Sequence, residues 1–250
     1  MKVFCAYDSE LDSFIKTVAD YVLKKYGNEL DLRDVHEIEI VKELDNKNSD
    51  GRFIGSRIVL AERLYRALPC FDITMLEDND PFTGIVRTLY HEMGHATDMV
   101  RMPKMYEAVF DAFKAESMTN ELMSSFLFLE YAAERRTGHI RTKEDQMYCR
   151  AVGAGSWNKY KDVAPETDLA FNYLSKVLIY FIVRTREPTL RDQYLSYDKD
   201  PLLRKYADAL ESVLESTYME LPFDSIERCA RVADVMNNYR SLFEKKYAIK

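Results

Sequence analysis

The stretch YHEMGHATD, Tyr90 to Asp98, decides how the rest of the chain is interpreted. It holds two of the four histidines, His91 and His95, four residues apart, with Glu92 directly after the first. On a helix this spacing places both imidazoles on one face, where they can converge on a single cation. Glu92 would then lie beside the cation without binding it, where its carboxylate can take a proton from metal-bound water. The stretch therefore predicts a metal site on a helix.

The residues around this stretch agree with a helix. Asp80 is a candidate N-cap and Pro81 occupies the favoured first helical position. The apolar pattern continues to about Val100, and Pro103 stops the helix soon afterwards. Gly94 costs a helix interior up to about 1 kcal/mol relative to alanine. We therefore expect a neighbouring backbone to approach that glycine closely.

A catalytic zinc site needs a third protein ligand and one open position. The longer zincin pattern H-E-x-x-H-x-x-G-x-x-H is excluded, because Arg101 stands at its last position. In the segment FLEYAAERRTG, Glu130 and Glu134 stand one turn apart on a predicted helix. We favour Glu130 as the ligand over Glu134, and we retain Glu116 and Glu121 as less favoured alternatives because predicted helix boundaries shift by several residues.

Other polar residues near the motif are assigned structural roles. Asp98 lies one turn past His95 and is interpreted as a helix-surface carboxylate rather than a ligand. Arg135 and Arg136 are interpreted as a solvated or ion-paired helix face. A group opposite the metal normally stabilises the transition state. Several residues could take that part, although each fits a structural role better: Tyr131, Tyr148, Tyr160 and His139.

The stretch EYAAERRTG, residues 130–138, carries a resemblance to a known family. It is similar to the E-Y-x-A-D-x-x-G signature of membrane-bound CAAX-processing and HtpX-like peptidases of the gluzincin clan. More loosely, it resembles the glutamate helix of ImmA/IrrE-type peptidases. Together with the H-E-x-x-H motif, it makes residues 50–138 resemble a gluzincin-like zinc metallopeptidase.

The resemblance implies a role for each residue of the two motifs. His91, His95 and Glu130 look like the ligands of one zinc ion, and Glu92 looks like the general base. Glu134 looks like the acid that hydrogen-bonds and orients a ligating imidazole. Here the chain departs from the signature, since Glu134 stands where the family has aspartate.

The expected fold class is α+β and mostly helical, with a zincin-like core formed by a small N-terminal β-sheet, the active-site helix and the glutamate helix. Residues 1–140 are expected to form the metallopeptidase core, and residues 141–250 a helical C-terminal subdomain packed on it. Strands are predicted at 36–44 and 52–61, joined in a hairpin by the turn sequence NKNSDG, with a third at 71–76. Helices are predicted at 11–26, 60–68, about 80–100, 104–116, 119–137, 143–153, 166–186, 200–218 and 223–247.

Charge, apolar run length and cysteine spacing indicate which partners and which cellular location to expect for the protein. The net charge of −7 disfavours nucleic-acid binding, so no nucleic acid is expected. The longest apolar run, residues 177–183, is far shorter than a membrane span, and it is interpreted as part of a buried helix. The four cysteines form no C-x-x-C pair and are expected to be reduced, mostly buried thiols. Without a secretory signal at the N-terminus, we expect a cytoplasmic protein.

The predicted function is an intracellular zinc-dependent metallopeptidase that hydrolyses peptide bonds by Glu92-assisted attack of zinc-bound water. Its partner would be a peptide or protein substrate, which by analogy with the family would pair with the strand at 52–61. One alternative is a regulatory protein that keeps the zincin scaffold for protein binding without catalysis. Another is a mobile-element-type protease specific for one repressor. The sequence specifies neither the substrate nor the oligomeric state.

Overall fold

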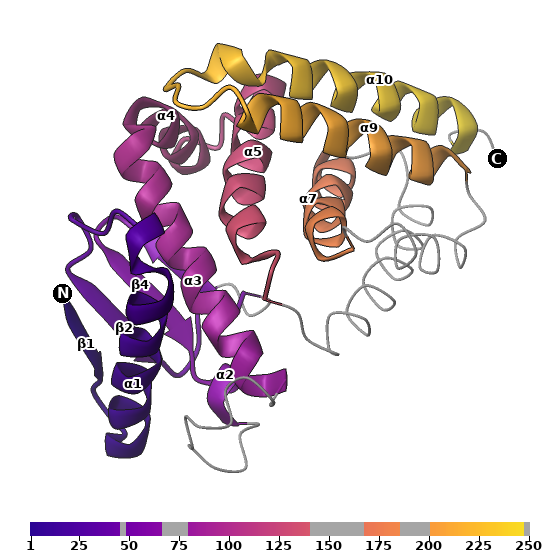
Figure 1. Cartoon of the computed structure of the whole chain (residues 1–250). Coiled ribbons are helices and arrows are strands. Elements are labelled where there is room, and N and C mark those ends of the chain that lie inside the picture. The colour runs from indigo at the N-terminus through magenta and orange to yellow at the C-terminus, as the bar shows by residue number, and fades with distance from the viewer. Residues whose placement is uncertain (46–48, 67–79, 141–167, 186–200, 248–250) are drawn as a thin grey trace. The chain divides into compact units, whose positions relative to one another are not determined.

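The computed structural model describes residues 1–45, 49–66, 80–140, 168–185 and 201–247 (Figure 1). These residues divide into two compact units. The first holds Met1–Val100 together with His139 and Ile140, and the second holds Arg101–Gly138 together with the described residues from Asp168 onward. The division of the sequence at residue 140 stays a prediction.

The first unit contains a four-stranded mixed sheet with the strand order β1-β2-β4-β3. Strands β1 (Lys2–Cys5), β2 (Glu37–Val41) and β4 (Arg57–Ala61) are parallel. Strand β3 (Gly51–Ile54) pairs antiparallel with β4 and ends the sheet. The sheet therefore presents β3 at one of its edges.

The predicted strands are only partly correct. Strand β2 lies within the predicted strand 36–44. The predicted strand 52–61 is wrong as a single element, because Gly55, at a φ of 60°, turns the chain between β3 and β4. The predicted hairpin is also wrong, since β2 and β4 are parallel neighbours. Strand β1 was not predicted, and the predicted strand 71–76 lies outside the described residues.

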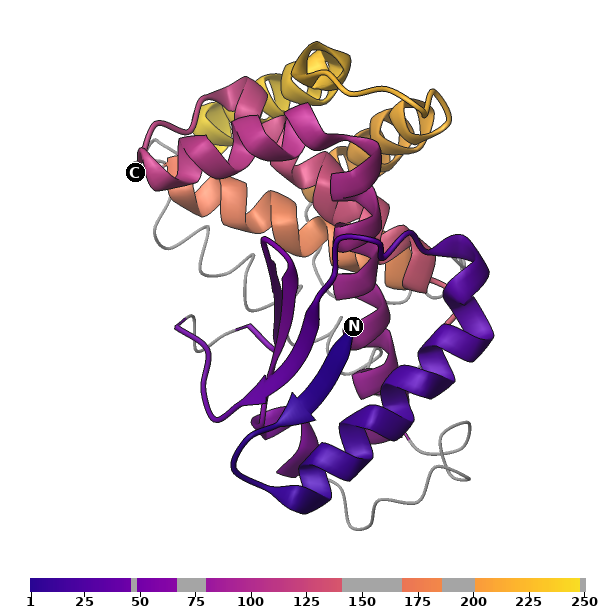
Figure 2. The same cartoon turned by 90° about the vertical axis from the view of Figure 1, so that its left-hand side faces the viewer.

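Helices α1 (Ser9–Tyr26) and α3 (Asp80–Arg101) share one hydrophobic core with the sheet, and Figure 2 shows α1 alongside the strands. The side chain of Asp8 caps α1 by accepting hydrogen bonds from two backbone N–H groups of its first turn. Every second residue of β2 and β4 points into the core, because strand side chains alternate between the two faces: Ile38, Ile40, Ile58 and Leu60. The short helix α2 (Arg63–Arg66) follows β4.

Helix α3 confirms the helix predicted around the histidine motif. It begins at Asp80 and ends at Arg101, just before Pro103. Its apolar stripe is buried in the core of the first unit: Ile85, Val86, Leu89, Tyr90, Met93 and Ala96. The ring of Tyr90 stacks on Tyr26 of α1 at 4.5 Å, and its hydroxyl donates to Glu29 at 2.8 Å. These contacts hold the motif-bearing helix against the C-terminal end of α1 and the turn that follows it.

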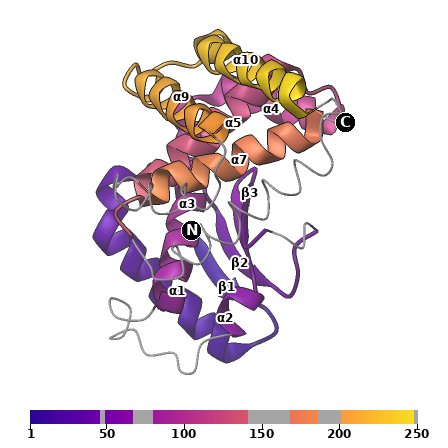
Figure 3. The same cartoon turned by 90° about the vertical axis from the view of Figure 1, so that its right-hand side faces the viewer.

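The second unit is helical in all of its described elements. It contains α4 (Pro103–Lys114), α5 (Asn120–Thr137), α7 (Asp168–Arg184), α9 (Pro201–Tyr218) and α10 (Ala230–Tyr247). Helix α5 packs against α4, α7 and α10, and α9 lies beside α10 (Figure 3). A short 3₁₀ helix, Ile226–Cys229, precedes α10, so the last helix starts later than predicted. The helix predicted at 143–153 lies outside the described residues.

The α+β, mostly helical fold class is confirmed, whereas the zincin-like core stays a prediction. The apolar run 177–183 lies within α7, as expected, and six of its seven residues are buried. None of the described helices is both long and apolar enough to cross a membrane. Cys5 and Cys229 are free, buried thiols, as expected, whereas Cys70 and Cys149 lie outside the described residues.

Candidate metal centre

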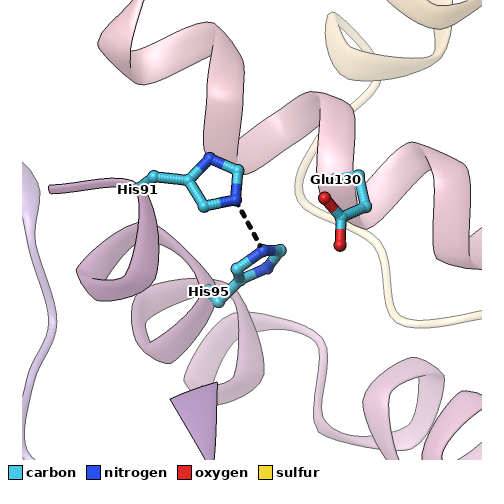
Figure 4. Close-up of side chains that lie close together, drawn as sticks. All are labelled: His91, His95 and Glu130. Carbon is cyan, nitrogen blue, oxygen red and sulfur yellow. Dashed lines mark hydrogen bonds between the residues drawn. The ribbon is translucent and has the colours of Figure 1, made fainter. Parts of the chain in front are cut away.

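The two histidines of α3 converge. Their Nε2 atoms lie 3.0 Å apart, and the ring planes are almost perpendicular, at 86°, with centroids 4.6 Å apart (Figure 4). Two nitrogens bound to one tetrahedral zinc ion at 2.0–2.1 Å lie about 3.3 Å from each other. The spacing of His91 and His95 therefore fits a shared metal ion.

Glu92 lies next to His91 in the chain and is buried, with 6% of its surface exposed. Strand β3 passes very close to the Glu92 side chain at Gly51. A Cβ atom added to Gly51 would lie 2.9 Å from Glu92 Cγ, 3.0 Å from its Oε1 and 3.1 Å from Leu60 Cδ2. Glycine is therefore required at this position for the edge strand to lie against the carboxylate. From the sequence, Gly51 was assigned only to a turn. The close approach of a neighbouring backbone was expected instead at Gly94, which is also buried.

Glu130 is buried in α5, and both of its oxygens accept hydrogen bonds from α7. Lys176 Nζ donates to Oε1 at 3.1 Å, and the Tyr180 hydroxyl donates to Oε2 at 2.5 Å. Burial, together with the carboxylates of Glu130 and Glu134, raises the pKa of Tyr180 well above its usual value. The tyrosine hydroxyl therefore keeps its proton and remains a donor to the carboxylate.

His91, His95 and Glu130 form a group that can hold a metal ion. One ligand atom of each residue lies within 4.8 Å of the other two (Figure 4). Two histidines and one glutamate are a donor set of catalytic zinc sites, in which the fourth position is left for water or substrate. The two less favoured glutamates, Glu116 and Glu121, are exposed and do not belong to this group.

Two further acids of the motifs are buried. Glu134 is 2% exposed and its Oε1 accepts a hydrogen bond from Arg184 Nε at 2.8 Å. Its expected role in orienting an imidazole stays a prediction. Asp98 is completely buried, so its interpretation as a surface carboxylate is wrong. Other polar residues of α3 are buried as well, namely His91, Glu92 and Thr97, so a polar side chain on this helix need not face solvent.

Two of the residues considered for transition-state stabilisation, Tyr131 and His139, lie in the described part of the chain, and both make structural contacts. The Tyr131 hydroxyl donates to Glu215, and Arg135 makes two hydrogen bonds to the same carboxylate at 2.9 and 2.6 Å. The ion-paired interpretation of Arg135 is therefore confirmed. The ring of His139 packs against two tyrosines of the first unit, Tyr26 and Tyr90. Tyr148 and Tyr160 lie outside the described residues.

Sequence reasoning missed three polar residues of α7 that donate hydrogen bonds to the two glutamates of α5. Lys176, Tyr180 and Arg184 are spaced four residues apart and therefore lie along one face of α7. They donate to Glu130 and Glu134, which are themselves four residues apart on α5. The available signal was this periodic set of donors in an otherwise apolar helix.

No family model, no curated protein and no solved structure matches the chain. The resemblance to gluzincin peptidases therefore stays a prediction, and the functional interpretation depends on the contacts described above.

Proposed function

We propose that the protein is a zinc-dependent peptidase of the gluzincin type. The observation that carries this proposal is the group formed by His91, His95 and Glu130, whose ligand atoms lie within 4.8 Å of one another. A buried carboxylate, Glu92, directly follows the first of these histidines in the sequence. Zinc is the proposed metal because two histidines and one glutamate are a donor set of catalytic zinc sites.

The chemistry divides between the metal and the protein. A zinc ion held by His91, His95 and Glu130 would supply Lewis acidity, which would make a water molecule at the site more acidic. Glu92 accepts the proton of the attacking water and delivers it to the leaving amine. The close approach of Gly51 restricts the positions open to the Glu92 side chain, which favours a fixed position of the proposed base.

Strand β3 is the proposed support for an extended substrate. It ends the sheet, and within the described part of the chain no strand pairs with its outer edge. Extended peptides bind such edges through backbone hydrogen bonds. The sequence predicted that a substrate would pair with residues 52–61, which comprise most of β3 and all of β4. Because β4 lies between β2 and β3 and has both of its edges paired, only β3 is left as the proposed substrate-binding strand. The contact of Gly51 with Glu92 brings this edge strand next to the proposed base.

The proposal is tested by metal analysis and by removal of the base. The purified wild-type chain is expected to contain about one equivalent of zinc and to cleave members of a peptide library, as read by mass spectrometry. Glu92→Gln is expected to keep the zinc and to lose cleavage by at least a hundredfold, because only the proton acceptor is removed. The matched control is Glu107→Gln, on the exposed surface of α4, which should leave both properties unchanged.

Two results would contradict the proposal. A wild-type chain that does not bind zinc would exclude the metal site. Equal cleavage by wild-type protein and the Glu92→Gln variant would exclude the proposed mechanism. Zinc binding without cleavage of any library member by the wild-type protein would favour the scaffold alternative, in which the site binds metal and the protein acts by binding others.

A further inference from the structure

The proposed metal ligand Glu130 is held by two chemically different donors of the same helix. Tyr180 is neutral and donates one hydrogen bond to Oε2, whereas Lys176 carries a positive charge beside Oε1. Both contacts lie between α5 and α7, which pack closely within the second unit. The two donors therefore have different consequences for a divalent cation that binds the same carboxylate.

Tyr180 favours metal binding by Glu130. A carboxylate oxygen has two lone pairs, so Oε2 can accept the tyrosine hydroxyl and leave a lone pair for a metal. Glu130 is 6% exposed, so water has little access to take the place of a lost donor. The hydrogen bond fixes the carboxylate in one orientation, and such contacts typically contribute a factor of 10 to 100 to metal affinity.

Lys176 opposes metal binding at the same carboxylate. Its ammonium group lies 3.1 Å from Oε1 and neutralises a buried negative charge that would otherwise be costly. A divalent cation at Glu130 is repelled by this ammonium group at short range. The same Nζ lies 5.0 Å from the centroid of the Phe126 ring, which stabilises the cation independently of the carboxylate.

We propose that α7 sets the metal affinity of the site through these two residues: Tyr180 positions the Glu130 carboxylate for the metal, and Lys176 competes with the metal for it. This inference rests on the proposed function, since it assumes that Glu130 is a metal ligand. Tyr180 is a positioning residue that acts through Glu130. Lys176 acts as an internal counter-cation whose interaction with the carboxylate is weakened when the metal binds.

The test measures the metal affinity of the full chain by competition between the protein and a chromophoric chelator for zinc. Tyr180→Phe is expected to weaken zinc binding by about 10- to 100-fold. Lys176→Met is expected to tighten it by about tenfold, because a repelling charge is removed. The matched controls are Tyr173→Phe, an exposed tyrosine of the same helix, and Lys205→Met, an exposed lysine of α9, and both should bind zinc like the wild type.

Opposite signs in the two variants support the inference, because general damage to the fold would weaken binding in both. Wild-type affinity in both variants, or weaker binding in both, would overturn it. In a Glu130→Gln background, Tyr180→Phe should have no further effect; an undiminished effect there would show that the tyrosine does not act through Glu130.

Two further results separate the possible failures. If Tyr180→Phe does not fold, Lys176→Met decides alone: tighter zinc binding supports the inference, and unchanged or weaker binding overturns it. If the wild-type chain itself does not bind zinc, the proposed function fails. If the wild-type chain binds zinc and the variants match it, only the inference about α7 fails.

Discussion

Gly51 is the single residue at which one added methyl group has the clearest expected effect. In Gly51→Ala the new Cβ would lie 2.9 Å from Glu92 Cγ, so the proposed base or strand β3 must shift. Overpacking of this kind typically costs about 1–3 kcal/mol of stability. Displacement of a catalytic group by about 1 Å can cost a hundredfold in rate. We expect a lower melting temperature and a strongly reduced cleavage rate with zinc content retained.

The control for this variant is Gly27→Ala. Gly27 has helical backbone angles, and a Cβ atom there would meet no heavy atom within 4 Å. Thermal unfolding and cleavage rates are measured for both variants under the same conditions. An alanine at Gly51 that leaves both quantities at wild-type values would show that Glu92 and β3 are not in close contact.

Individual site residues differed in how well the sequence predicted them. His91, His95 and Glu92 were assigned correctly to one helix, because their spacing is a local property of the chain. Gly51 was not connected with Glu92, since a contact between a strand and a helix 41 residues later leaves no periodic signal. Asp98 was misjudged for a related reason: burial of a polar side chain depends on elements that pack from elsewhere in the chain.

Helices α5 and α7 are joined by a buried ion pair, and its loss should lower the free energy of unfolding substantially. The side chains of Glu134 and Arg184 are 2% and 13% exposed. Removal of one partner of a buried ion pair typically costs about 3–5 kcal/mol, because the remaining buried charge loses an opposite charge. We expect Arg184→Leu to lower the free energy of unfolding by about that amount in urea titrations performed with chelator present.

The comparison for this pair is Arg231→Leu, which breaks the exposed ion pair of Arg231 with Glu220. Exposed pairs contribute about 0–1 kcal/mol, so the control should change stability little. The double variant Arg184→Leu with Glu134→Leu should recover part of the loss, because the buried carboxylate is then removed as well. Equal losses for Arg184→Leu and Arg231→Leu would contradict the buried pairing.

Helix α4 receives its N-terminal cap from a distant residue. Met102, at the usual cap position, makes no side-chain hydrogen bond to the helix. Instead the Asp224 carboxylate accepts from the backbone N–H groups of Lys104 and Met105, at 3.1 and 3.0 Å. Removing such a cap costs about 0.5–2 kcal/mol, so Asp224→Ala should lower the free energy of unfolding by that amount.

Chemical denaturation measures this loss, and Asp224→Asn is the matched comparison. The asparagine keeps one side-chain oxygen acceptor, so it should retain part of the stability that alanine loses. Unchanged stability in Asp224→Ala would mean that this contact between the loop before α10 and the start of α4 contributes nothing.

Helices and strands were predicted well where local sequence features mark their ends, and poorly where the pairing between distant strands determines the structure. Helices α3 and α5 appear close to the predicted boundaries because caps, proline and apolar spacing mark their ends. The strand 52–61 was predicted as continuous because β-branched residues flank Gly55 on both sides, although that glycine turns the chain. The pairing of β2 with β4 in parallel depends on the whole sheet, and no local feature indicates it.

For the whole molecule, the proposed metal should contribute measurably to stability. A ligand present at 100 times its dissociation constant stabilises the folded state by about 2.7 kcal/mol. For a chain of 250 residues this corresponds to a rise of roughly 5–10 °C in melting temperature. We therefore expect a chelator to lower the melting temperature of the zinc-loaded protein by about that amount, as measured by differential scanning calorimetry.

Two variants show whether this shift comes from the proposed ligands. His95→Ala should melt at the same temperature with and without chelator, because a ligand is lost. Glu92→Gln should keep the full shift, because the proposed base does not bind the metal. A chelator effect that survives in His95→Ala would place the bound metal elsewhere in the protein.

Strand β3 also has a consequence for solubility. Among the described strands none pairs with the outer edge of β3, and a strand edge of this kind can pair with the edge of another copy of the same chain, which leads to aggregation. Two properties of β3 limit that risk: it is only four residues long, and it presents the charged side chain of Arg52 to solvent. Replacing Arg52 with an apolar residue would weaken this protection beside Ile54, which is already 42% exposed. The composition of this short strand thus limits self-association while leaving the edge open for the proposed peptide substrate.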